Sequence, residues 1–82
     1  SGSMAAIDSR AMLWFRMGRF EDALRDLDVV VAQEPEKAPS RFMRGIVLKR
    51  LGRTSDGDAE LVIARRIDPH IPATYARFGI TP

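Results

Sequence analysis

The 82-residue chain contains no cysteine and no asparagine. Without cysteine it can form no disulfide and offers no thiol nucleophile, which is compatible with a reducing compartment, so we expect a cytoplasmic protein. No apolar run approaches the ~18 residues that a membrane-spanning helix needs. We therefore expect no association with a membrane.

Catalytic residue types are scarce. The only histidine is His70, directly after Pro69, and a catalytic or metal site needs several partners. No spacing matches a metal-ligand set or a phosphate-binding loop. Ser55 has no histidine placed to activate it, and Asp56 and Asp58 are ordinary acids for a helix start. These absences predict a protein that is not an enzyme and has no cofactor and no metal.

An internal repeat is the strongest positive signal. The stretch MGRFEDALRDLDVVVAQEP (17–35) recurs in altered form, at a constant offset, as LGRTSDGDAELVIARRIDP (51–69). The agreement extends upstream, and Gly79 aligns with Gly45 as the start of a third copy. The main aligned pairs are Arg10 with Arg44, Leu13 with Val47, Arg16 with Arg50, Met17 with Leu51, Gly18 with Gly52, Leu27 with Leu61 and Pro35 with Pro69.

Each copy shows the apolar periodicity of two helices. Gly18 and Gly52 are placed to end the first helix of each copy in the left-handed conformation, and Pro35 and Pro69 to stop the second. Thr54 or Ser55 is expected to N-cap the fourth helix. We predict an all-α protein of about five helices, over residues 4–17, 20–33, 39–51, 54–67 and 72–78.

The chain divides accordingly into two units and a terminal helix. The first unit is predicted at 4–37 and the second at 38–71, followed by a C-terminal capping helix and tail at 72–82. Residues 1–3, Ser-Gly-Ser, have the composition of a cloning remnant and are excluded from this division.

These residues resemble the tetratricopeptide repeat family, whose period equals the offset between the two copies. The resemblance implies an α–α superhelix of helix–turn–helix units that serves protein–protein interaction. Arg10 and Arg44 stand where the family usually has a large apolar residue, and Gly57 replaces a small alanine. The matching residues are Ala11, Trp14, Gly18, Ala23, Leu27, Val30 and Pro35, then Gly45, Leu48, Gly52, Leu61, Ala64 and Pro69, and finally Tyr75, Phe78 and Gly79.

The resemblance also implies a concave binding face on the first helix of each unit. Its apolar stripe would be Met12, Phe15, Phe42 and Ile46, edged by basic side chains. Without asparagine, and with Asp8 and Met12 at clamp-like positions, the face does not fit the subtype that grips a C-terminal carboxylate. By position, the partner-binding residues would be Asp8, Met12, Phe15, Arg16, Phe42, Ile46, Lys49 and Arg50.

Three functional hypotheses follow. The first is a scaffold or adaptor that forms a homo-oligomer through the apolar stripe, which otherwise buries against missing repeats. The second is a groove for an apolar peptide with acidic flanks. The third is RNA binding by helical-pair repeats, which the small net charge of +2 does not favour. The basic residues of the third helix are expected to pair at the surface with the acids of the second helix.

Overall fold

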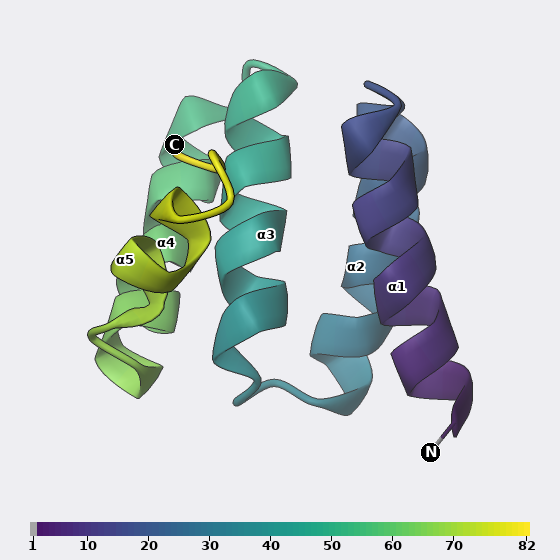
Figure 1. The fold of residues 1–82 in the computed structure, drawn as a ribbon, viewed down its shortest axis with the longest axis horizontal. Helices are drawn as coiled ribbons and strands as arrows, with labels where there is room; N and C mark the ends of the chain where they lie inside the picture. Colours follow the sequence, from purple (N-terminus) through teal and green to yellow (C-terminus); the bar gives the residue numbers. More distant parts are fainter. Residues whose placement is uncertain (1) are drawn as a thin grey trace.

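The computed structural model describes residues 2–82, in which five helices and no strand are present. This confirms the all-α prediction (Figure 1). Ser1 of the predicted cloning remnant lies outside the described residues, whereas Gly2 and Ser3 begin the first helix, ahead of its predicted start at Met4. The helices are α1 (Gly2–Arg16), α2 (Phe20–Gln33), α3 (Ala38–Arg50), α4 (Thr54–Ile67) and α5 (Ile71–Ala76).

Glycine ends α1 and α3 as predicted. Gly18 and Gly52 have φ values of 75° and 82°. After α1, the Arg19 N–H donates to the Trp14 carbonyl at 2.8 Å and the Gly18 N–H to the Phe15 carbonyl at 3.0 Å. This pair of bonds is a Schellman motif, which satisfies carbonyls that have no partner inside the helix.

α4 begins at Thr54, as predicted, but its N-cap residue differs from the prediction. Neither Thr54 nor Ser55 is the N-cap, because the helix begins at Thr54 and the N-cap is Arg53, which makes no side-chain capping bond. The Arg53 N–H already donates to the Leu48 carbonyl at 2.9 Å to close the turn after α3. One residue thus serves both helix ends.

The sequence repeat is visible in the helix bounds. The first and last residues of α4 are those that align with the first and last residues of α2, and α3 ends at the residue that aligns with the end of α1. The alignment of Gly79 with Gly45 is wrong. Gly45 lies inside α3, whereas Gly79 has a φ of 76° and ends the turn after α5, as Gly18 and Gly52 do after α1 and α3. The terminal helix is thus a shortened counterpart of α1 and α3.

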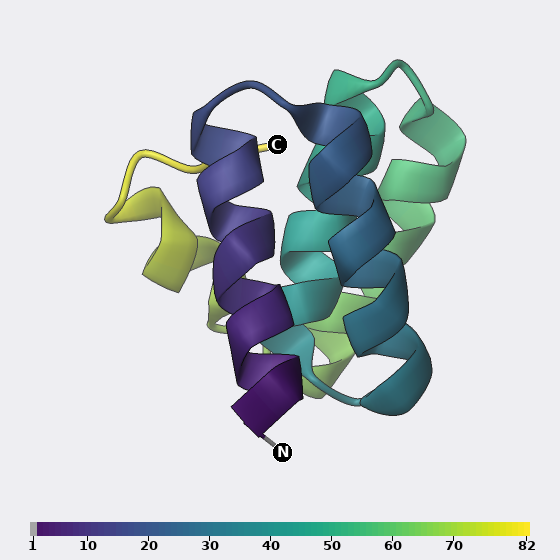
Figure 2. The same ribbon diagram turned by 90° about the vertical axis from the view of Figure 1, so that its right-hand side faces the viewer.

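Helices pack mainly on their neighbours in sequence, α1 with α2, α2 with α3, α3 with α4 and α4 with α5, and α5 also packs on α3. Figure 1 shows α1 and α5 on opposite flanks of α3, and Figure 2 shows that both lie toward the same face of the molecule. Because α3 has neighbours on several sides, eight of its residues are buried. The largest fully buried side chains are Phe42, Leu27, Ile46, Val30 and Val47.

Candidate functional site

The predicted apolar stripe is only partly open. Phe42 and Ile46 are 0% exposed, so the expectation that they lie on an open concave face is wrong. The Tyr75 ring of α5 stacks on Phe42 with the ring centroids 5.2 Å apart. Ile71 and Ile80, from α5 and the turn after it, belong to the same core cluster. The C-terminal segment therefore covers side chains that periodicity alone left without a neighbour.

The polar residues of the predicted face also have partners within the chain. Asp8 accepts a hydrogen bond from Ser40 Oγ at 3.2 Å and pairs with Lys37 Nζ at 3.0 Å. Lys49 pairs with Asp58 of α4 at 2.8 Å. The guanidinium of Arg50 lies over the Phe15 ring, 5.3 Å from its centroid. Of the eight predicted residues, Met12 and Arg16 are the two that line an open groove.

That groove has a volume of about 290 Å³ and lies between α1 and α5. Its wall includes Phe78, which is 66% exposed, and its single charged residue is Arg16. No carboxylate of residues 2–82 forms an ion pair with Arg16. The lining residues are Met12, Arg16, Pro39, Ile71, Thr74, Tyr75, Phe78 and Ile80.

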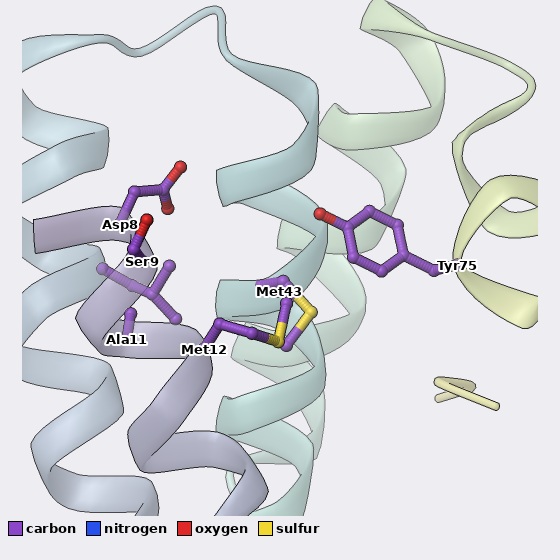
Figure 3. Close-up of a pocket in the computed structure, with 7 residues that line it drawn as sticks. Asp8, Ser9, Ala11, Met12, Met43 and Tyr75 are labelled. Atoms are coloured by element: carbon purple, nitrogen blue, oxygen red, sulfur yellow. The ribbon is translucent and has the colours of Figure 1, made fainter. Parts of the chain in front are cut away.

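A second hollow of about 210 Å³ shares Met12 and Tyr75 with the groove and extends to Asp8 (Figure 3). In Figure 3 the Tyr75 side chain reaches from α5 toward Met12 and Met43. Burial, together with the negative charge of Asp8, raises the pKa of the Tyr75 hydroxyl. The hydroxyl, which is protonated at pH 7 even at the ordinary pKa of 10.0, can donate a hydrogen bond.

The basic residues of α3 and its following turn are largely neutralised. Arg44 Nε pairs with Asp28 at 2.8 Å and its Nη1 with Glu60 at 3.3 Å, while Arg53 pairs with Glu21 at 3.7 Å. Arg41 also pairs with Glu60, at 2.8 Å. The predicted pairing with acids of α2 is confirmed for Arg44 and Arg53, whereas Arg41 and Lys49 pair with acids of α4. These pairs leave α3 without the continuous cationic surface that RNA binding would use.

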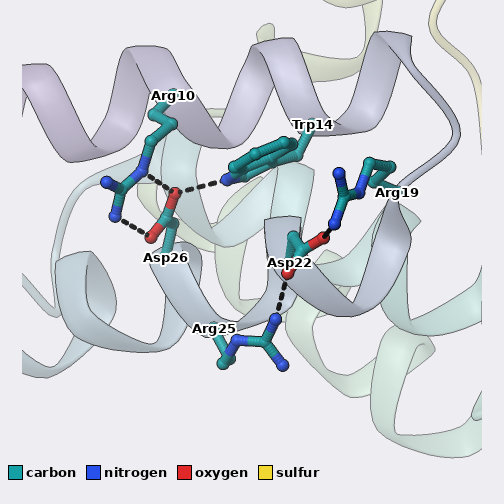
Figure 4. A network of polar contacts seen from close by, with 6 residues as sticks. All are labelled: Arg10, Trp14, Arg19, Asp22, Arg25 and Asp26. Carbon is teal, nitrogen blue, oxygen red and sulfur yellow. Dashed lines mark hydrogen bonds and ion pairs between the residues drawn. The ribbon is translucent and has the colours of Figure 1, made fainter.

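A polar network around the buried carboxylate of Asp26 connects α1 to α2 and was not anticipated (Figure 4). Arg10 donates to both carboxylate oxygens of Asp26, at 2.8 Å from Nε and 2.7 Å from Nη2, and Trp14 Nε1 donates to Asp26 at 3.1 Å. The hydrogen bonds from Arg10 hold the pKa of Asp26 below its usual value, although burial opposes this. The repeat contained the signal, because Glu60, aligned with Asp26, is likewise buried against arginine.

Other features of the described residues complete the survey. His70 is exposed, and residues 2–82 contain no cluster of three potential metal ligands. None of the described helices has both the length and the apolar character needed to cross a membrane. Comparison with protein-family models, curated proteins and solved structures finds no match to this chain.

Proposed function

We propose that the chain is a protein-interaction module of the tetratricopeptide-like kind, and that the groove between α1 and α5 binds a peptide segment of a partner protein. The matched helix bounds support the resemblance. The Arg10–Asp26 ion pair of the first unit recurs as Arg44–Glu60 in the second, which supports the internal repeat, although both arginines depart from the family pattern. The superhelical course and the adaptor role belong to this proposal.

The observation that carries the proposal is an apolar groove with one unpaired cation at its edge. A peptide side chain that covered Phe78 and Met12 would remove apolar surface from water. A carboxylate near it could accept charge-assisted hydrogen bonds from Arg16. The preferred ligand is thus an apolar residue with an acidic neighbour, as in the second sequence-based hypothesis. With Phe42 and Ile46 buried, self-association through the original stripe loses two of its four apolar contacts.

The test is selection of short random peptides on the immobilised full chain, followed by fluorescence anisotropy with the enriched sequences. We expect enrichment of an apolar residue beside an acidic one. Loss of a charged hydrogen bond costs about 1.5–3 kcal/mol, so Arg16→Gln should weaken binding roughly 10- to 100-fold. Phe78→Ser should also weaken it.

Arg66→Gln is the matched control. Arg66 is an exposed arginine of α4 that does not line the groove, so its substitution should leave the affinity unchanged. Enriched peptides that lacked acids, or that bound the Arg16→Gln variant as tightly as the unmodified chain, would refute the assignment of this groove.

A further inference from the structure

A second surface lies on the face of α1 that points away from the groove. Leu13 and Met17 are 60% and 64% exposed there, and with Ala6 and Arg10 they form what we call the outer stripe of α1. These residues recur at i, i+4, i+7 and i+11, so they share one helix face. Exposure of two large aliphatic side chains in one stripe is a feature of interaction surfaces.

The second copy of the repeat contains the equivalent stripe, and there other parts of the protein cover it. The residues of α3 that align with the outer stripe of α1 are Ser40, Arg44, Val47 and Leu51, and Val47 is 0% exposed where Leu13 is 60% exposed. Beside Arg44 the neighbour of α3 is α2, since Arg44 Nε pairs with Asp28 at 2.8 Å and Leu24 and Asp28 share a hollow with Arg44 and Leu48. Ser40, at the start of the stripe, instead donates a hydrogen bond to Asp8 of α1 at 3.2 Å. The α2–α3 contact is therefore an example, within this molecule, of what covers such a stripe.

Comparison of the two aligned arginines shows which contact Arg44 makes and Arg10 does not. Arg44 divides its guanidinium between Glu60 of its own unit and Asp28 of the preceding helix. Arg10 gives both Nε and Nη2 to Asp26 of its own unit, and its side chain is 58% exposed. Among the described residues, no second carboxylate lies beside Arg10 in the way that Asp28 lies beside Arg44.

We propose that the outer stripe of α1 docks an amphipathic helix of a partner polypeptide, with an aliphatic residue and, four residues later, an acidic residue. This is the pattern of Leu24 and Asp28 in α2. The aliphatic residue covers part of the surface of Leu13, and the carboxylate pairs with Arg10. A second copy of this chain fits poorly, because its own Leu24 and Asp28 already face α3. The aligned residues of its α4 are Asp58 and Val62, which place the acid one turn too early and an aliphatic group opposite the arginine.

A fusion protein in which the first unit occurs twice tests the proposal. A copy of residues 4–37 is fused directly before residue 4 of the chain, so that the added α2 meets α1 as α2 meets α3. The added copy carries Met17→Leu, so that the only Met17 whose oxidation is measured is the one in the outer stripe. Because methionine oxidation depends on exposure, we expect peroxide to oxidise this Met17 several-fold more slowly than in the unmodified chain. Circular dichroism verifies that the added unit is helical.

Variants of the added copy identify the contact. Asp28→Asn should restore part of the oxidation rate, whereas Glu36→Gln, which also removes one negative charge, should not. As a second probe, a peptide of residues 18–37 added to the unmodified chain should change the fluorescence of Trp14, the only tryptophan, and Leu13→Glu should abolish that change.

An unprotected Met17 in the fusion protein together with no Leu13-dependent response to the peptide would overturn the proposal. Light scattering on the unmodified chain tests the competing occupant. Growth in molar mass with concentration that Leu13→Glu abolished would mean that a second copy binds the stripe, contrary to the partner proposed.

Discussion

Gly45 of α3 and Gly57 of α4 face each other so closely that neither has room for a Cβ atom. A Cβ on Gly45 would lie 2.9 Å from the Gly57 carbonyl oxygen, and one on Gly57 would lie 2.7 Å from the Gly45 carbonyl oxygen. The aligned residues of the first unit are Ala11 and Ala23. The second helix pair therefore makes a backbone contact for which alanine is too large.

The first prediction is that Gly57→Ala destabilises the protein. Helix propensity alone predicts a gain of about 0.5–1 kcal/mol from this change. The contact with the backbone of α3 predicts the opposite sign, a loss of about 1–3 kcal/mol from overpacking. Urea unfolding measures the difference, and Ala59→Gly at an exposed site of α4 calibrates propensity in the same helix. A more stable Gly57→Ala protein would show that α3 and α4 can move apart at little cost.

The second prediction concerns acid stability. Because the pKa of Asp26 is lowered on folding, the unfolded chain binds its proton more tightly than the folded protein does. The stabilisation is complete above the ordinary pKa of 3.8 and is lost as the pH falls below it toward the folded value. Asp26→Asn should therefore lower the free energy of unfolding at pH 7 and have a smaller effect near pH 3.

Chemical denaturation at several pH values measures this dependence. Glu36→Gln, at an exposed acid without an ion pair among the described residues, controls for the loss of one charge. A destabilisation by Asp26→Asn that stayed constant from pH 7 to pH 3 would mean that the network contributes through shape and hydrogen bonding, not through the ionised carboxylate.

The third prediction is that Phe42 supports folding. The stripe interpretation implied that Phe42→Glu together with Phe15→Glu would abolish association and preserve helicity. Since Phe42 is fully buried against Tyr75, we now expect Phe42→Ala to cost about 3–5 kcal/mol and Phe42→Glu to unfold the protein. Circular dichroism at increasing temperature distinguishes the two expectations. Phe78→Ala, at a 66% exposed ring, should leave the helical signal and the melting temperature nearly unchanged.

Signals that act over a few residues allowed most of the fold to be predicted. Gly18 and Gly52 identify two helix ends, and Pro35 and Pro69 follow two others, because backbone conformation at these positions depends on the residue itself. The N-cap of α4 was missed because Arg53 belongs to two motifs at once.

The candidate site could be predicted only in part. Periodicity finds the apolar faces of α3, but what covers Phe42 depends on the short helix α5, which follows only after the whole of α4. Asp26 looked like a surface acid of a charged helix, because its partner Arg10 belongs to a different helix. Gly57 looked like a defect in a helix until its distance to Gly45 was known. Each of these errors concerns contacts between helices, which sequence spacing does not specify.

The order in which the helices pack has a kinetic consequence. Since most contacts join helices adjacent in sequence, little loop entropy opposes assembly, and proteins of low contact order fold on the microsecond to millisecond scale. The same connectivity makes the free energy of local unfolding differ along the chain. The short α5 and the outer helix α1 can detach while α3 and α4 stay paired, so exchange of amide hydrogens with solvent should be slowest around Gly45 and Leu61 and fastest toward both termini.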